Sequence, residues 1–237
     1  MRARQLLITM LGTVFAPGLF SACDALESIY DNDRTDIPPI EQQQYYDGVV
    51  KSGSFYADAT SYTQWVYINL HGDSLTMTSS TISIEDCSET GAPEEWDFAM
   101  HRYDVKTNGG SVIQTDFNSI EQLESNMPEA PAEGWTEDEY SDESVTIDMS
   151  HMLEGYLVYA PGYKNKTAGL WLDVDTSTMP PNYTMSDKVF LYKFSDGTCA
   201  AIQLKNYMSN DRYQTKGWMT VAYKYPMFVK IKEESAL

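Results

Sequence analysis

Short runs of aromatic and β-branched residues, separated by turn-forming residues, recur along most of this chain. Such runs occupy residues 65–70, 81–84, 170–174, 189–194, 199–204 and 218–225. Short apolar runs bounded by turn signals are typical of β-strands, and Ser195-Asp196-Gly197 predicts a hairpin between two of them. No long stretch combines helical spacing of apolar residues with capping residues. The sequence therefore predicts an all-β fold, a single antiparallel β domain of short strands and hairpins.

Residues 96–107 form the longest of the expected strands. Apolar side chains alternate along them, so that Phe98 and Met100 would face one side and Ala99 the other. Asn108-Gly109-Gly110 tolerates positive φ, and we expect the strand to turn back there into residues 111–115. His101 lies inside this strand, where a hydrogen-bonded structural role is favoured over a ligand role.

An acidic segment interrupts the strand pattern. Nine acidic residues and no basic residue lie between Phe117 and Ser144. Ser119 could cap a short helix that ends near Asn126, and the rest of the segment predicts a long, solvated acidic loop. We therefore expect at most one short helix in the domain.

The N-terminus has the features of a lipoprotein signal peptide. Residues 1–22 combine a basic start with a short apolar run, and small residues precede Cys23, although Phe20 is larger than the usual pattern has. We predict removal of residues 1–22, acylation of Cys23, a flexible tether over residues 23–44, a β domain over 45–227 and a tail over 228–237. The alternative is ordinary secretion with Cys23 as a free thiol.

The charge of the mature chain limits its partners. Loss of Arg2 and Arg4 with the signal peptide leaves 14 basic and 35 acidic residues, a net charge of −21. Nucleic-acid binding needs Lys and Arg side chains that neutralise backbone phosphates. A chain with this excess of acidic residues does not provide them, which excludes nucleic acids as partners. Electrostatic attachment to anionic lipid is equally unfavourable, so membrane attachment would depend on the lipid anchor alone.

The motifs of common enzyme classes are absent from the sequence. The chain has no Gly-x-Ser-x-Gly elbow and no Gly-rich or Walker phosphate-binding loop, and its three histidines are isolated from one another. We therefore predict a binding protein and not an enzyme. The two cysteines left after Cys23, Cys87 and Cys199, do not form a disulfide framework.

Two polar turns carry methionines that no apolar periodicity would bury. Met179 precedes Pro180-Pro181, and Met149, His151 and Met152 lie in a turn over residues 148–155. Met149 and Met152 would share a face if this turn is helical. Thioether sulfur and imidazole nitrogen are both axial ligands of haem iron, whereas core packing is the other explanation for such methionines.

Residues 96–110 resemble the characteristic strand of the HmuY-like haem-binding lipoproteins of anaerobic Gram-negative bacteria, and the resemblance extends over about residues 62–226. It implies one axial haem ligand in the loop after residues 145–148 and another between residues 174 and 181. Met179 is the candidate second ligand because that loop has no histidine. For the first ligand the resemblance favours Met152, with Met149 and His151 as alternatives.

The resemblance implies a function in haem and iron acquisition. Such a protein would be anchored by lipid in the outer membrane, facing the cell exterior, and would pass haem to a TonB-dependent outer-membrane transporter. Two alternatives remain open at this point. One is a glycan-binding lipoprotein of a polysaccharide-import system, with Trp135, Trp171 and tyrosines stacking on sugars. The other is an adhesion or scaffold lipoprotein.

Overall fold

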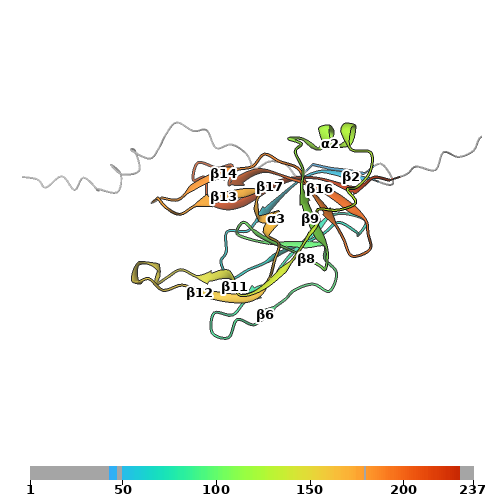
Figure 1. Cartoon of the computed structure of the whole chain (residues 1–237). Helices are drawn as coiled ribbons and strands as arrows, with labels where there is room; N and C mark the ends of the chain where they lie inside the picture. Colours follow the sequence, from blue (N-terminus) through green and yellow to red (C-terminus); the bar gives the residue numbers. More distant parts are fainter. Residues whose placement is uncertain (1–42, 47–49, 179, 230–237) are drawn as a thin grey trace, which may run out of the picture. The chain divides into compact units, whose positions relative to one another are not determined.

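The largest element of the fold is a seven-stranded antiparallel sheet (Figure 1). The structure is a computed structural model, and it describes residues 43–46, 50–178 and 180–229. The strand order is β1 (Gln43–Tyr46), β2 (Lys51–Asp58), β17 (Lys216–Met227), β16 (Cys199–Met208), β15 (Phe190–Lys193), β9 (Ser111–Gln114) and β10 (Thr136–Glu137). The hairpin predicted across residues 195–197 is present, because Lys193 pairs with Cys199 and Phe190 with Ile202.

A four-stranded antiparallel sheet packs against the first one. Its order is β4 (Thr76–Ser79), β3 (Val66–Asn69), β7 (Phe98–His101) and β8 (Asp104–Thr107). Phe98 of this sheet lies 6.4 Å from Phe55 and 5.2 Å from Tyr192 of the larger sheet, measured between ring centroids. All three rings are buried in one shared core, which the alternation of apolar residues along the strands supplies.

Three two-stranded pairs complete the β structure of the residues described. They are β5 (Thr81–Ile82) with β6 (Glu89–Thr90), β11 (Glu139–Asp148) with β12 (Val158–Lys164), and β13 (Leu172–Asp175) with β14 (Asn182–Met185). The all-β prediction is confirmed for the described residues.

Helix α2 (Ile120–Asn126) confirms the helix expected in the acidic segment. The Ser119 hydroxyl accepts a hydrogen bond from the Gln122 backbone N–H at 3.2 Å and so caps the helix. Leu123 is buried against Leu191 and Ala201 of the large sheet. The rest of the acidic segment is not the continuous loop that we expected. Strand β10 and residues 139–143 of β11 lie within it.

The expectation of at most one short helix was wrong, because a second short α-helix is present. Helix α3 (Lys166–Gly169) begins at Asn165, whose side chain accepts a hydrogen bond from the Ala168 backbone N–H at 2.9 Å. A single turn is too short to show helical periodicity, and this local cap stabilises it. A 3₁₀ turn, η1 (Met152–Glu154), follows β11.

The prediction of one long strand over residues 96–107 was also wrong. The chain reverses at Arg102, which has φ +55°, and His101 pairs with Asp104 across a two-residue turn. The Arg102 guanidinium donates to the backbone carbonyl of Thr60, so this turn is stabilised without Gly or Asn. We expected residues 111–115 to pair with the strand that precedes them, which is β8. Strand β9 pairs instead with β15 and β10.

The N-terminal predictions fall largely outside the described residues. The signal peptide 1–22, Cys23 and the tether except residues 43 and 44 are among the residues not described, as are residues 230–237 of the tail. Their boundaries stay predictions. Within the described part of the chain, no helix is long and apolar enough to cross a membrane.

Candidate functional site

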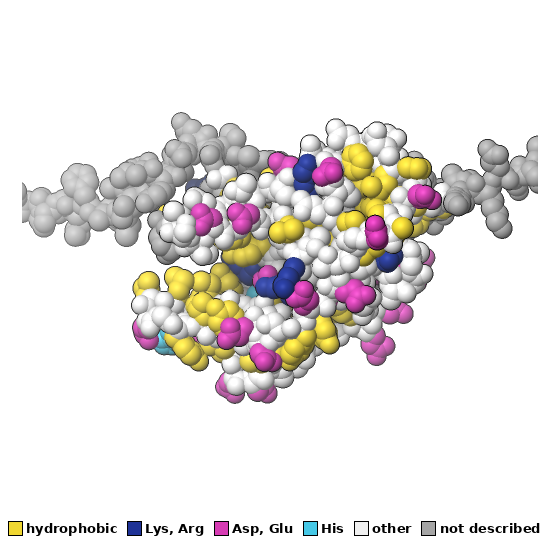
Figure 2. All heavy atoms as spheres, viewed as in Figure 1, with side chains coloured by type: hydrophobic (Ala, Val, Ile, Leu, Met, Phe, Trp, Pro, Cys, Tyr) yellow, Lys and Arg dark blue, Asp and Glu magenta, His cyan; other side chains and the backbone are white. Residues whose placement is uncertain are grey.

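Two hairpins, β11–β12 and β13–β14, extend from the same side of the sheets (Figure 1). The surface is hollowed between them, and hydrophobic side chains gather on the β11–β12 hairpin along this hollow (Figure 2). The turn expected to carry the first haem ligand connects β11 to β12, and the turn expected to carry the second connects β13 to β14.

Both hairpins are attached to the turn between β7 and β8. The Tyr103 hydroxyl lies 3.4 Å from the Tyr183 hydroxyl of β14. The next residue, Asp104, lies 3.2 Å from the Lys164 ammonium of β12. Tyr103 of the turn and Asp104, the first residue of β8, therefore contact the two hairpins. The sequence did not reveal this role because it depends on the unexpected reversal at Arg102.

An aromatic and cationic cluster surrounds Tyr183. Its ring stacks on Tyr207 with centroids 5.4 Å apart, and the Lys216 ammonium lies 3.9 Å from its centroid. Burial, with a contribution from the hydrogen bond to Tyr183, raises the pKa of Tyr103 to about 12. Tyr103 is therefore a neutral hydrogen-bonding group at physiological pH.

The first hairpin turn exposes its donor residues. Met152 is 39% exposed, Leu153 is 94% exposed and Met149 is half-buried. The Met152 backbone N–H donates to the Met149 carbonyl at 3.0 Å, so a tight turn joins these residues. The helical turn itself, η1, covers only Met152–Glu154 and does not include Met149. His151 is exposed, and its Nδ1 lies 3.1 Å from a carboxylate oxygen of Glu154. All three candidate first ligands are thus present in one short turn.

The second hairpin turn contains Met179, which lies outside the described residues. The residues around it are described. Asn182 donates from its side-chain amide to the Thr178 hydroxyl at 3.1 Å, and this hydroxyl donates to the Pro180 carbonyl at 3.2 Å. These bonds close the turn on both sides of Met179.

His101 has the structural role expected for it. It is buried, and its Nε2 donates to the Tyr62 carbonyl at 2.7 Å. Burial lowers the pKa of His101 and so favours the neutral ring. The part of the chain that is described contains no group of three or more His, Cys, Asp or Glu side chains able to hold a metal ion.

Of the two tryptophans considered for glycan stacking, Trp171 is buried and Trp135 is half-buried. Trp171 is 1% exposed, and its indole N–H donates to the Tyr103 carbonyl at 2.8 Å. Trp135 is half-buried beneath the Lys193 ammonium, which lies 4.7 Å from its ring. Trp171 therefore supports the core and offers no face to a sugar at the surface.

Comparison with known proteins gives the same family as the sequence resemblance. The family model described as HmuY protein matches residues 61–223. A candidate lipoprotein of Bacteroides fragilis is 45% identical, with a TM-score of 0.65 over 74% of this chain and 89% of that chain. A candidate HmuY-like haem-binding protein of Bacteroides vulgatus is 41% identical, with a TM-score of 0.64 over 76% and 93% of the two chains.

More distant structures share the fold. The apo form of a HmuY analogue from Tannerella forsythia is 22% identical, with a TM-score of 0.57 over 75% of this chain and 98% of that chain. No curated protein matches the sequence. The family match over most of the described residues, together with relatives above 40% identity that are covered almost completely, identifies this chain as a member of the HmuY family.

Proposed function

We propose that this protein is a surface lipoprotein that binds haem between its two hairpin turns and delivers it to a TonB-dependent outer-membrane transporter. It would be attached through acylated Cys23 to the outer membrane and face the cell exterior. The observation that carries the proposal is the contact of both hairpins with the adjacent residues Tyr103 and Asp104, because the two turns that carry the candidate ligands then extend from one common base.

The exposed apolar residues of the first turn support a ligand at this place. Met152, Leu153 and Tyr156 are all exposed, and such grouped apolar exposure is unfavourable in water unless a partner covers it. Haem is a large apolar ring with iron at its centre, and thioether sulfur is one of its natural axial donors. The haem-binding description of the B. vulgatus relative agrees with this choice of ligand.

We assign Met152 and Met179 as the axial ligands. Met152 is the more exposed of the two methionines in the first turn. Met149 is the first alternative. His151 is the second, since its Nδ1 faces Glu154 and its Nε2 has no hydrogen-bond partner among the described residues. We expect the protein to carry haem and not to transform it.

The decisive experiment is a haem titration of the mature protein, followed by Soret absorbance with ferric haem and again after reduction with dithionite. We expect a saturable spectral change with one haem per chain in the reduced state. Absence of a saturable change in both oxidation states would contradict the proposal.

A further inference from the structure

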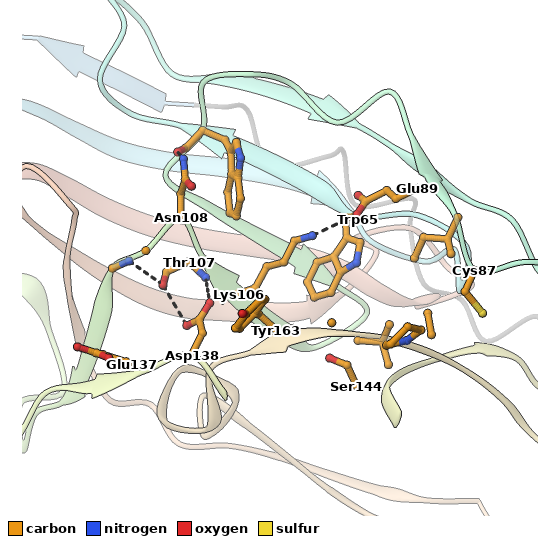
Figure 3. Close-up of a pocket in the computed structure, with 18 residues that line it drawn as sticks. Trp65, Cys87, Glu89, Lys106, Thr107, Asn108, Glu137, Asp138, Ser144 and Tyr163 are labelled. Atoms are coloured by element: carbon orange, nitrogen blue, oxygen red, sulfur yellow. Dashed lines mark hydrogen bonds and ion pairs between the residues drawn. The ribbon is translucent and has the colours of Figure 1, made fainter. Parts of the chain in front are cut away.

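A cavity of 640 Å³ lies beneath the β11–β12 hairpin, between it and the four-stranded sheet (Figure 3). Its walls include Trp65, Ile82, Val145 and Ala160. Among its described lining residues none comes from residues 149–156 or from the β13–β14 hairpin. The cavity is therefore separate from the turns to which we assign haem.

A bulge in β11 shapes this cavity. Ser141 pairs with Gly162 and Val145 with Ala160, so residues 142–144 lie opposite Pro161 alone. Proline has no backbone N–H to donate, and the extra residues of a bulge bend the strand locally. Gly162 has φ +157° at the same place. The bulge turns Ser144 toward the cavity (Figure 3).

The Ser144 hydroxyl is buried without a partner. Ser144 is 3% exposed, and its Oγ has no hydrogen-bond partner among the described residues. A buried hydroxyl without a partner is destabilising relative to a hydrogen-bonded one, because it has lost its bonds to water. A hydroxyl that lines a cavity and lacks a protein partner is well suited to bond a ligand.

The charges around the cavity have an acidic excess. The Lys106 ammonium lies 4.3 Å from the Trp65 ring centroid, donates to the Tyr67 hydroxyl at 2.7 Å, and lies 3.4 Å from the Glu89 carboxylate. Glu89 therefore balances Lys106. The two remaining carboxylates, Glu137 and Asp138, have no cation within ion-pair distance among the described residues.

Hydrogen bonds fix Asp138 while Glu137 stays accessible. The Asp138 carboxylate accepts from the Thr107 hydroxyl at 3.0 Å and from the Asn165 amide at 2.9 Å. Glu137 is exposed beside it. In Figure 3 both residues lie at one end of the cavity, with Glu89 and Cys87 at the other.

Aromatic rings at the cavity offer faces for stacking. Tyr163 is 58% exposed and Trp96 is half-buried. Aromatic faces attract cations, and a cavity between about 300 and 1,000 Å³ is typical of small-molecule sites. The walls thus combine apolar surface, aromatic faces, an unpaired hydroxyl and negative charge.

We infer that this cavity binds a small organic cation, a primary amine joined to a flat ring. The ring lies against Trp96 and Tyr163, the ammonium group faces Glu137 and Asp138, and Ser144 bonds a polar atom of the ligand. This site goes beyond the proposed haem function and does not depend on it.

The test uses two probes that share a ring and differ in charge. Tryptamine carries an ammonium group and indole-3-propionate a carboxylate, and each is titrated into the mature protein by isothermal calorimetry. We expect one tryptamine to bind per chain, at least ten times more tightly than indole-3-propionate. Equal binding of the two probes, or no saturable binding of either, would overturn the inference.

Variants locate the binding. Glu137→Gln and Tyr163→Ala alter exposed side chains, so folding should be retained, and each should weaken tryptamine binding at least threefold. Ser144→Val should weaken it as well. Tyr213→Ala is the matched control, because Tyr213 is 69% exposed and does not line the cavity. If Glu137→Gln and Tyr163→Ala bind tryptamine as the control does, the site is elsewhere and the inference fails.

A final variant separates this inference from the proposed haem function. Met152→Ala should leave the affinity for tryptamine unchanged, because Met152 is in the hairpin turn outside the cavity. Loss of tryptamine binding in this variant would mean that the probe binds between the hairpin turns, and the assignment to the cavity would be rejected.

Discussion

The hydroxyl groups of Tyr103 and Tyr183 lie 3.4 Å apart and join the β7–β8 turn to the β13–β14 hairpin. The adjacent Asp104, at the start of β8, contacts Lys164 of the β11–β12 hairpin. Residues 60 and 62 stabilise the turn itself. The Arg102 guanidinium lies 4.4 Å from the Tyr62 ring centroid and donates to the Thr60 carbonyl. The relative position of the two hairpins therefore depends on a few side chains of one reversal.

Loss of the tyrosine contact should reduce stability. We expect Tyr103→Phe and Tyr183→Phe each to lower the free energy of unfolding by about 0.5–1.5 kcal/mol, the usual net value of a hydrogen bond. The double variant should cost less than the sum, because the first change already removes the shared contact. Urea unfolding measures all three. Tyr213→Phe, at an exposed position, should stay close to wild type, and full additivity of the tyrosine pair would contradict the contact.

The sequence predicted the strands whose apolar patterns are bounded by strong turn residues. The β15–β16 hairpin has Asp196-Gly197 at its turn, and α2 has Ser119 as its cap, so local chemistry specified both. It did not predict the reversal at Arg102, because that turn takes its stability from Thr60 and Tyr62, which are distant in sequence. Long-range contacts of this kind leave no local pattern.

The candidate site was predictable only in part. Met149, His151 and Met152 stand out because they lie in a polar turn, and the structure brings them together. The joint contacts of Tyr103 and Asp104 with the hairpins, and the cavity beneath β11–β12, were not predictable. Both depend on pairing between distant strands, and the bulge at residues 142–144 lies within a segment that composition alone marks as an acidic loop.

Gly217 should be intolerant of a side chain. It has φ +102°, and an added Cβ would lie 2.9 Å from the Thr60 Cα and 3.0 Å from the Ala59 carbonyl oxygen. Left-handed backbone alone costs an L-residue about 1–2 kcal/mol. We expect Gly217→Ala to lower the free energy of unfolding by about 2 kcal/mol or more. Gly169→Ala is the control, because no atom lies within 4 Å of its added Cβ, and a similar loss in both variants would refute the steric explanation.

Stability should fall in acid partly because of His101. Burial lowers its pKa in the folded state, so the unfolded chain, with a histidine pKa of about 6.5, binds the proton more readily. The contribution of neutral His101 is therefore complete above pH 6.5 and decreases as the pH falls toward the lower folded-state pKa. In urea unfolding, the stability difference between wild type and His101→Gln should shrink between about pH 7.5 and pH 5. A difference that stays constant with pH would show that His101 does not titrate as expected.

The predicted lipid anchor can be tested by phase partitioning. If Cys23 is acylated, the wild-type protein should enter the detergent phase of a Triton X-114 extraction, and Cys23→Ala should remain in the aqueous phase. Each buried methylene of an acyl chain contributes about 0.8 kcal/mol, so two chains dominate the partitioning of a protein with this acidic surface. Cys87→Ala is the matched control and should partition as wild type does. Equal partitioning of wild type and Cys23→Ala would reject the anchor.

The proposed methionine ligands predict that haem binding depends on oxidation state. Thioether sulfur is a soft, neutral donor that favours ferrous over ferric iron, whereas imidazole serves both states. The protein should therefore bind haem more tightly after reduction. Met152→Ala and Met179→Ala should each leave weaker, five-coordinate ferrous binding, and the double variant should retain only apolar contacts.

Titrations in both oxidation states on wild type, the two single variants and the double variant check this prediction. Met77→Ala is a methionine control, since Met77 packs against the main core and lies outside both hairpin turns. A wild-type ferrous spectrum and affinity in Met179→Ala would disprove the second ligand. If Met152→Ala binds haem as wild type does while Met149→Ala or His151→Ala binds it more weakly, the first ligand is the residue whose substitution weakens binding. Since His151 would bind ferric haem as well, equal affinity in the two oxidation states would favour it over either methionine.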